Sequence, residues 1–306
     1  MKSFLPISII LPALLLFLPP VFGADAASIK KNVPFSVGER LTFQVKWAFI
    51  PAGEAVLEVL PLENVSGIQA RHFVLTARTY PFFDLIYKVR RRIDGYTDMQ
   101  MKRSLLYRKR KMGEGCEEII VRFDWEKGVA WYSRLGTPGD AVALLSGTLD
   151  PLSVFYAFRF RNLKENTSLR SPVSDGKRCV IGAARVIRRE KIRGVLGSFD
   201  TFLVEPEVKK IGGIFKKSRK ARLQVWITAD EKRIPVRVKT RVAVGSFVAE
   251  LVSYERGVGQ TSVQVSEAPI DPASPEPFSY RLYPSMSEPA ARVRSVSRGV
   301  SLWRAR

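Results

Sequence analysis

Histidine and cysteine, two side chains often used in catalysis and metal binding, are scarce in this sequence. The chain holds one histidine, His72, and two cysteines, Cys116 and Cys179. One histidine leaves little for a Ser-His hydrolase, and two distant cysteines without metal-ligand spacing do not indicate a structural zinc site. Glu117 and Glu118 are adjacent, and neighbours in a strand point to opposite faces, so they do not form an acid and base pair. The sequence therefore predicts no catalytic residue, no metal and no cofactor.

Common motifs of enzyme sites are absent as well. The chain has no G-x-S-x-G elbow, P-loop, dinucleotide fingerprint or H-E-x-x-H sequence. A hydrolase would need His72 exposed to solvent beside a carboxylate and a hydroxyl, whereas a lone histidine in a strand is more often structural. The cysteines leave two alternatives open, a disulfide between them or two separate buried thiols.

The charge of the chain is strongly positive and predicts anionic partners. Fifty Lys and Arg against 29 Asp and Glu give a formal net charge of +21 and a pI near 10.2. Such a field attracts nucleic acid, anionic lipid headgroups and lipopolysaccharide phosphates. The alternative is that the basic residues only solvate the outer face of a sheet.

The N-terminus reads as an export signal over residues 1–26. Lys2 precedes an apolar run from Phe4 to Phe22, and small residues follow up to Ala26. Four prolines interrupt the run and argue against a retained membrane helix, and no cysteine near the cleavage site could carry a lipid. We therefore expect a periplasmic protein with no transmembrane span after cleavage. Export makes nucleic acid the least suitable of the three polyanions.

The clearest structural pattern lies between Arg222 and Glu250. It predicts a hairpin of two strands joined by a tight turn at 231–233. Val236 and Val238 fall on one side of the second strand, while Arg237 and Arg241 fall on the other, because successive side chains point to opposite faces. The expected sheet is apolar on one face and cationic on the other.

Other segments extend the sheet in both directions. Leu41–Trp47 and Ile68–Thr79 are predicted strands, and the basic stretch from Phe82 to Met112 is predicted to be two strands joined by a turn at Asp94-Gly95. Residues Arg134 to Gly147 are expected to form a loop.

One helix is predicted, over about 150–161. Asp150 can cap its first free N–H groups, and Pro151 suits the first helical position. Leu152, Phe155 and Tyr156 follow helical spacing, so this helix should cross the apolar face of the sheet. Two segments should contribute little to the core: a basic loop with Ile214 and Phe215 at its tip, and a disordered Pro/Ser/Arg-rich tail over 260–306.

Several stretches together resemble the exported bacterial family of domain of unknown function 3108. They are Gly38–Trp47, Pro51–Leu57, Asp150–Ser153, Ser174–Lys177, Gly197–Phe199 and Val225–Val236. The resemblance spans about Phe35 to Tyr254. It implies one β-rich domain over about 35–256, a strongly curved antiparallel sheet or open barrel, and no established activity.

These expectations combine into a hypothesis of a non-catalytic binding or carrier module. A bent sheet crossed by a helix can hold a lipid-like ligand, while arginines meet anionic groups. The expected partners are anionic lipid or lipopolysaccharide; the alternative is a structural or assembly role with another envelope protein, and a hydrolase is the third hypothesis. The residues predicted to bind the ligand are Trp47, Phe155, Trp226, Arg90, Arg91, Arg92, Arg237 and Arg241.

Overall fold

The computed structural model describes residues 33–113, 115–207, 221–242 and 245–258, which belong to one compact unit, Val33–Arg306. Three predicted features lie outside the described residues. They are the signal peptide over 1–26, the loop tip with Ile214 and Phe215, and the tail over 260–306.

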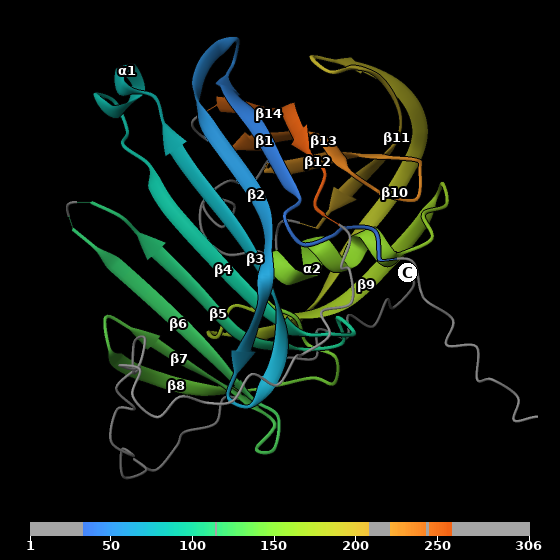
Figure 1. Ribbon diagram of the computed structural model, residues 1–306. Coiled ribbons are helices and arrows are strands. Elements are labelled where there is room, and N and C mark those ends of the chain that lie inside the picture. The colour runs from blue at the N-terminus through green and yellow to red at the C-terminus, as the bar shows by residue number, and fades with distance from the viewer. Residues whose placement is uncertain (1–32, 114, 208–220, 243–244, 259–306) are drawn as a thin grey trace, which may run out of the picture. The chain divides into compact units, whose positions relative to one another are not determined.

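In the described residues, fourteen antiparallel strands form a single sheet (Figure 1). Its order is β8-β7-β6-β5-β4-β3-β2-β1-β14-β13-β12-β11-β10-β9, so two meanders meet where β1 pairs with β14. The strands are β1 Arg40–Trp47, β2 Ile50–Val65, β3 Ile68–Thr79, β4 Arg90–Asp98, β5 Ser104–Lys111, β6 Glu117–Asp124, β7 Val129–Arg134, β8 Thr137–Ala143, β9 Thr167–Ser174, β10 Cys179–Gly194, β11 Gly197–Pro206, β12 Arg222–Thr228, β13 Pro235–Val242 and β14 Gly245–Glu255. The sheet curves but does not close, which confirms the predicted fold class.

Helix α2, Pro151–Ala157, lies across one face of the sheet, which we call the inner face (Figure 1). The Asp150 carboxylate accepts the backbone N–H groups of Leu152 and Ser153, both at 2.9 Å, which confirms the predicted cap. A 3-10 turn, η1 Phe158–Phe160, continues the helix to its predicted end. The only other helical segment in the described residues is a single turn, α1 Pro81–Asp84.

Arg159 anchors the end of this helical segment to the start of the sheet. Its guanidinium makes two contacts with the carboxylate of Glu39, at 2.5 and 3.0 Å, and both side chains are almost fully buried. A buried bidentate pair of this kind is costly to break from one side, because it leaves an uncompensated charge. The helix is therefore held at both ends, by a cap at Asp150 and an ion pair at Arg159.

The predicted turn at Asp94-Gly95 is wrong, since both residues lie inside β4. Gly95 is required there by a close approach rather than by a turn. A Cβ atom on Gly95 would lie 2.9 Å from the side-chain oxygens of Asp150 and Ser153, so the glycine makes room for the N-terminus of α2. The chain instead reverses between β4 and β5, after Asp98.

The structure also corrects the predicted loop over 134–147 and the predicted second arm of the hairpin. Residues Thr137–Ala143 form β8, an end strand whose Pro138 and Gly139 are compatible with an edge position. The arm that follows β12 consists of two strands, β13 and β14, and Gly245 begins the second with a φ of +125°. A positive φ at a glycine inside a valine-rich stretch ends one strand and starts the next.

The two cysteines are free thiols in the structure. Cys179 is buried at the start of β10, and Cys116 is exposed just before β6. Of the two alternatives, the structure has separate thiols, although only one of them is buried.

Candidate functional site

The inner face of the sheet is hollow where α2 crosses it. A partly open cavity of about 350 Å³ lies there, and none of its lining side chains is charged. The lining residues are Phe43, Ala55, Leu57, Leu75, Ile93, Tyr107, Pro151, Leu152, Phe155, Val238 and Ala249. They come from β1 to β5, from α2, and from β13 and β14, so both meanders contribute to the wall.

Strand alternation explains why these residues meet. Phe43 of β1 pairs in register with Ala55 of β2, and Val238 of β13 pairs with Ala249 of β14. Residues paired in this way project to the same face of the sheet. Phe155 of α2 points at them from the other side of the cavity, as its helical spacing predicts.

Tyr107 brings the one hydroxyl to this wall. The side chain is buried, and burial raises the pKa of its phenol above the ordinary value. The nearby carboxylates of Asp150 and Asp175 act in the same direction. The phenol is therefore neutral at physiological pH, and the cavity wall carries no charge.

Basic side chains continue the inner face beyond the cavity, toward the end of the sheet where α1 lies. Arg91 follows Ile93 on that face of β4, and Lys109 follows Tyr107 on that face of β5. Lys109 pairs in register with Ile93 itself. Among the described residues, no carboxylate makes an ion pair with either side chain.

The surroundings of Lys109 do not compensate its charge fully. Burial lowers the pKa of the Lys109 ammonium, and the positive charges of Arg91 and Lys177 lower it further. Glu117 and Asp175 oppose this only at longer range. Glu117 forms an ion pair with Arg134 at 2.9 Å, and Asp175 accepts backbone N–H groups of its own turn. The inner face therefore offers an anion the half-buried cations Arg91 and Lys109, and Lys111 pairs in register with Arg91 at the end of β5.

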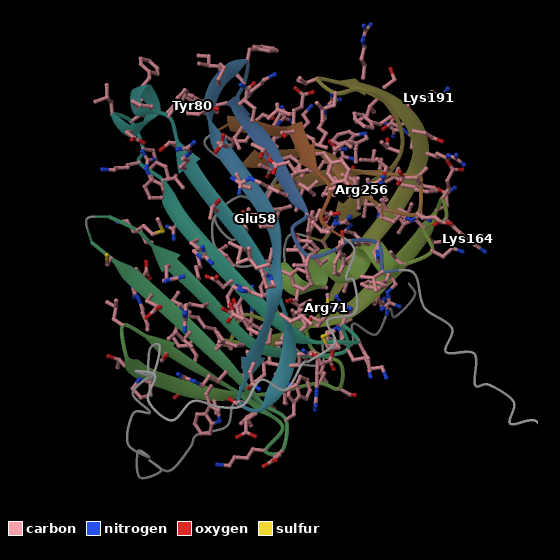
Figure 2. All side chains as sticks on the ribbon, viewed as in Figure 1. Glu58, Arg71, Tyr80, Lys164, Lys191 and Arg256 are labelled. Carbon is pink, nitrogen blue, oxygen red and sulfur yellow. The ribbon has the colours of Figure 1, made fainter. Side chains whose placement is uncertain are left out.

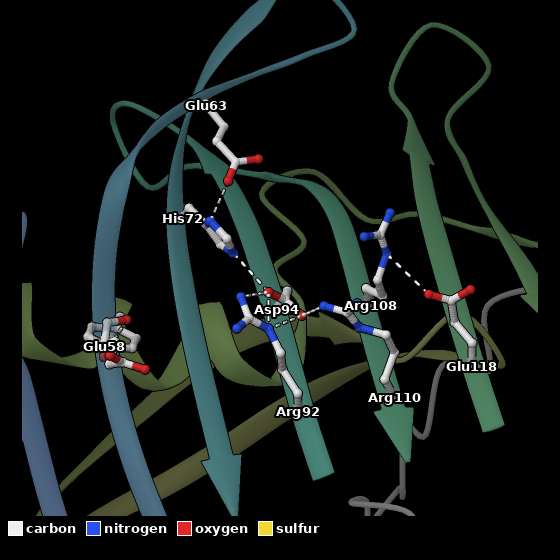
Figure 3. Close-up of polar contacts among 9 residues, drawn as sticks. Glu58, Glu63, His72, Arg92, Asp94, Arg108, Arg110 and Glu118 are labelled. Atoms are coloured by element: carbon white, nitrogen blue, oxygen red, sulfur yellow. Dashed lines mark hydrogen bonds and ion pairs between the residues drawn. The ribbon is translucent and has the colours of Figure 1, made fainter. Parts of the chain in front are cut away.

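The opposite, outer face of the same strands carries a compact ionic cluster (Figure 3). The Asp94 carboxylate lies at its centre, 2.8 Å from Nη2 of Arg92, 3.0 Å from Nε2 of His72 and 3.3 Å from Nη2 of Arg110. On its other side, Nδ1 of His72 lies 2.8 Å from Glu63. The cluster joins β2, β3, β4 and β5 across the sheet.

Asp94 is ionised in this cluster. Burial alone would raise the pKa of its carboxyl, but hydrogen bonds from His72 and Arg92 outweigh burial and hold the pKa below its ordinary value. His72 is only 2% exposed and its ring is stacked on Tyr96, so it does not form the solvent-exposed site that the hydrolase hypothesis requires. The cluster is built to join strands.

The predicted ligand-binding residues are divided between the two faces of the sheet. Phe155 lines the cavity and Arg91 lies beside it. Trp226, Arg237 and Arg241 belong to the outer face. Arg237 lies over the Trp226 ring and binds Glu250 at 2.6 Å, Trp226 donates to Glu190 at 2.9 Å, and Arg241 is exposed.

The remaining three predicted residues also lie away from the cavity. Arg90 binds Asp84 at 2.6 Å, and Arg92 belongs to the Asp94 cluster. The Trp47 ring contacts Phe83 edge to face, with 6.0 Å between the ring centroids. Any contact of these residues with a ligand stays a prediction.

Sequence reasoning missed Lys109 and most of the apolar wall. The signal for Lys109 was present, because alternation along β5 places it on the face of Tyr107 while Arg108 and Arg110 take the other face. The wall depends on which strands become neighbours, and the alternation within one strand does not determine this.

A comparison with protein families gives one match to the chain. The model described as "Protein of unknown function (DUF3108)" matches residues 42–252. The chain belongs to this family. No curated protein matches this DUF3108 protein. Among the described residues, no helix is long and apolar enough to cross a bilayer, and no group of three or more His, Cys, Asp or Glu side chains could hold a metal ion.

Solved structures of low sequence identity are similar to parts of the DUF3108 fold. A β-barrel-like protein of domain of unknown function DUF1849 from Brucella abortus has 12% identity and a TM-score of 0.46, covering 72% of this chain and 98% of its own. A Bacteroides fragilis protein described as exported, with a YmcC-like fold, has 10% identity and a TM-score of 0.30, with 73% and 98% covered. A Parabacteroides distasonis protein described as a lipoprotein has 12% identity and a TM-score of 0.31, with 73% and 98% covered.

Proposed function

We propose that this DUF3108 protein is a carrier of a single-chain anionic amphiphile in the bacterial cell envelope. The acyl chain occupies the inner cavity, and the head group lies beside Arg91 and Lys109. The observation that carries the proposal is the cavity of about 350 Å³ with no charged side chain in its wall.

A cavity of this size is too large to be a packing defect. Because the cavity is partly open, its apolar wall faces water when nothing occupies it, at a cost of about 25 cal/mol for each Å² of apolar surface. Water can enter through the open side, but an apolar wall offers it few hydrogen-bond partners. An apolar occupant removes the cost.

The volume also selects among the expected ligands. Small-molecule pockets span roughly 300–1,000 Å³, and this one is near the lower end. One acyl chain suits it better than the several chains of lipopolysaccharide. A carboxylate or phosphate head then has the nearby ammonium of Lys109 and guanidinium of Arg91, which form charge-assisted hydrogen bonds with anions.

Titration with a dansyl-labelled fatty acid tests the proposal, because the fluorescence of the dye rises in an apolar site. The purified protein should bind the probe and release it when an unlabelled fatty acid is added. Ala249→Phe should weaken binding by at least about tenfold, because the ring fills the cavity. Ala55→Leu, a smaller change on the other neighbour of β1, should act in the same direction.

A matched control comes from the next residue of β14. Val248 alternates with Ala249 and pairs with Lys46 and Lys239, so it belongs to the outer face. Val248→Phe should leave probe binding unchanged. Equal binding by the wild-type protein and by Ala249→Phe and Ala55→Leu would overturn the proposal.

A further inference from the structure

Three loops lie at one end of the sheet (Figure 1), and each presents exposed apolar side chains. The turn between β1 and β2 presents Phe49, 94% exposed. The segment containing and following α1 presents Phe82, Leu85 and Tyr87, which are 65%, 86% and 67% exposed. The tip between β10 and β11 presents Val195 and Leu196, which are 62% and 46% exposed. We call this set the apolar tips.

Contacts between the loops hold the tips at the same end. The backbone N–H of Tyr80 donates to the carbonyl of Ala52 at 3.0 Å, which ties α1 to the start of β2. Arg237 donates to the carbonyl of Arg193 at 2.6 Å and also binds Glu250, which Lys46 of β1 contacts at 3.1 Å. Figure 2 shows Tyr80 beside α1 and Lys191 near the tip between β10 and β11.

The charge around the tips is positive. Lys88, Lys191 and Arg193 are exposed, and none of them has an ion-pair partner among the described residues. The carboxylates of this end are engaged elsewhere: Glu54 with Arg78, Asp84 with Arg90, and Asp200 with Arg189. The cations are therefore available to an external anionic surface.

The shape of this end distinguishes a membrane from a protein partner. Protein interfaces bury a contiguous patch with a packed core. The apolar tips instead lie on three separate loops, each of which presents its own exposed apolar side chains. Aromatic and aliphatic side chains flanked by Lys and Arg are the composition that inserts into the headgroup region of a bilayer.

We propose that this end of the protein docks on an anionic bilayer surface, with the apolar tips inserted to a shallow depth and Lys88, Lys191 and Arg193 against the lipid phosphates. The docking surface is distinct from the ligand cavity and goes beyond the proposed function. Because Arg91 and Lys109 lie on the side of the cavity nearer α1, docking would turn the charged part of the inner face toward the membrane.

Co-sedimentation with vesicles tests the docking. The purified protein should bind vesicles of phosphatidylglycerol and phosphatidylethanolamine in equal parts more tightly than vesicles of phosphatidylcholine alone. Binding should weaken as salt is added, because salt screens the exposed charges. Absence of binding to the anionic vesicles, or equal binding to both compositions, would overturn the proposal.

Substitutions separate the apolar contribution to vesicle binding from the electrostatic contribution. Leu85→Ser with Phe49→Ser should weaken vesicle binding by roughly tenfold or more, because both side chains would leave the bilayer. Lys88→Gln should weaken it by roughly fivefold at low salt, and the difference should vanish at high salt. Ile68→Ser is the control, because Ile68 is an exposed apolar residue at the start of β3, at the opposite end of β2.

The cavity variant distinguishes this proposal from the carrier function. Ala249→Phe should leave vesicle binding unchanged, since Ala249 lies in the cavity wall. Tip variants that bind vesicles as well as the wild-type protein would overturn the docking proposal whatever the outcome of the fatty-acid titration.

Discussion

Neighbouring cations of β4 and β5 have opposite surroundings on the two faces of the sheet. On the outer face, Arg92 and Arg110 share the carboxylate of Asp94. On the inner face, Arg91 and Lys109 have no ion-pair partner among the described residues. The four residues come from two short basic runs, and one step along the strand decides whether a charge is neutralised.

This difference distinguishes cations that stabilise the fold from cations that can bind a ligand. A cation that meets a buried carboxylate joins strands, and its loss leaves that carboxylate uncompensated. A cation without a partner next to an apolar cavity contributes little to folding but can bind an external anion. The comparison therefore predicts opposite effects of substitutions on the two faces.

The largest expected effect comes from removing the shared carboxylate. Asp94→Asn removes the negative charge and one of the two acceptor oxygens that Arg92, Arg110 and His72 share, and we expect a loss of about 3 kcal/mol in the free energy of unfolding. Urea denaturation followed by circular dichroism measures it. A loss below about 1 kcal/mol, which is typical of exposed ion pairs, would contradict the structural role of the cluster.

Substitution of the adjacent residues Arg91 and Arg92 tests which face of the sheet binds the head group. Arg91→Gln should weaken binding of the dansyl-labelled fatty acid by roughly tenfold, because a hydrogen bond to a charged group contributes about 1.5–3 kcal/mol. Arg92→Gln should leave the affinity for the probe unchanged and lower stability instead. The reverse result would place the head group on the outer face.

Acid should reveal the ionised state of Asp94. Its folded-state pKa is held below the ordinary value of 3.8, so its stabilisation is fully present above that value and is lost progressively as the pH falls from there toward the lower folded-state pKa. The free energy of unfolding should therefore fall more steeply between about pH 5 and pH 3 in the wild-type protein than in Asp94→Asn. Parallel curves for the two proteins would show that Asp94 does not titrate in this way.

The smallest expected effect is on the stability of a Lys109 variant. Burial and the charge of Arg91 disfavour the ammonium in the folded protein. Lys109→Met should therefore leave the free energy of unfolding unchanged or raise it by up to about 1 kcal/mol. The same substitution should lower the affinity for the fatty-acid probe. Thermal unfolding gives the first quantity and fluorescence titration the second. A clear loss of stability would mean that Lys109 has a structural partner.

Most strands of the sheet could be predicted from the sequence, because alternation of apolar and polar residues is a local pattern. Alternation gave β3 with its observed ends, and Asp150 with Pro151 placed the start of α2. The errors have physical causes beyond local pattern. Gly95 looks like a turn residue, but it is needed where a helix end approaches, and the turn-forming residues of β8 belong to an edge strand.

The candidate site was less predictable than the fold. Phe155 and Arg91 could be proposed from helical spacing and charge, and both lie at the cavity. The sequence does not show that Asp94 meets Arg92 and Arg110, because the partner of a charge depends on strand register and on the face of the sheet. The hollow itself depends on how β1 to β5, β13 and β14 come together around α2, which no local pattern encodes.

The open edge of the sheet bears on how cargo could be exchanged. In the described residues, β8 and β9 are the margins of the sheet and do not pair with each other. Beside β9, a seam is formed by two backbone hydrogen bonds of Leu149, one with Pro172 and one with Ser174, at 3.1 and 3.0 Å. Hydrogen bonds contribute roughly 0.5–1.5 kcal/mol each, so parting such a seam is far less costly than unzipping a strand from a sealed cylinder. The proposed carrier would then load and release its ligand without unfolding of the wall.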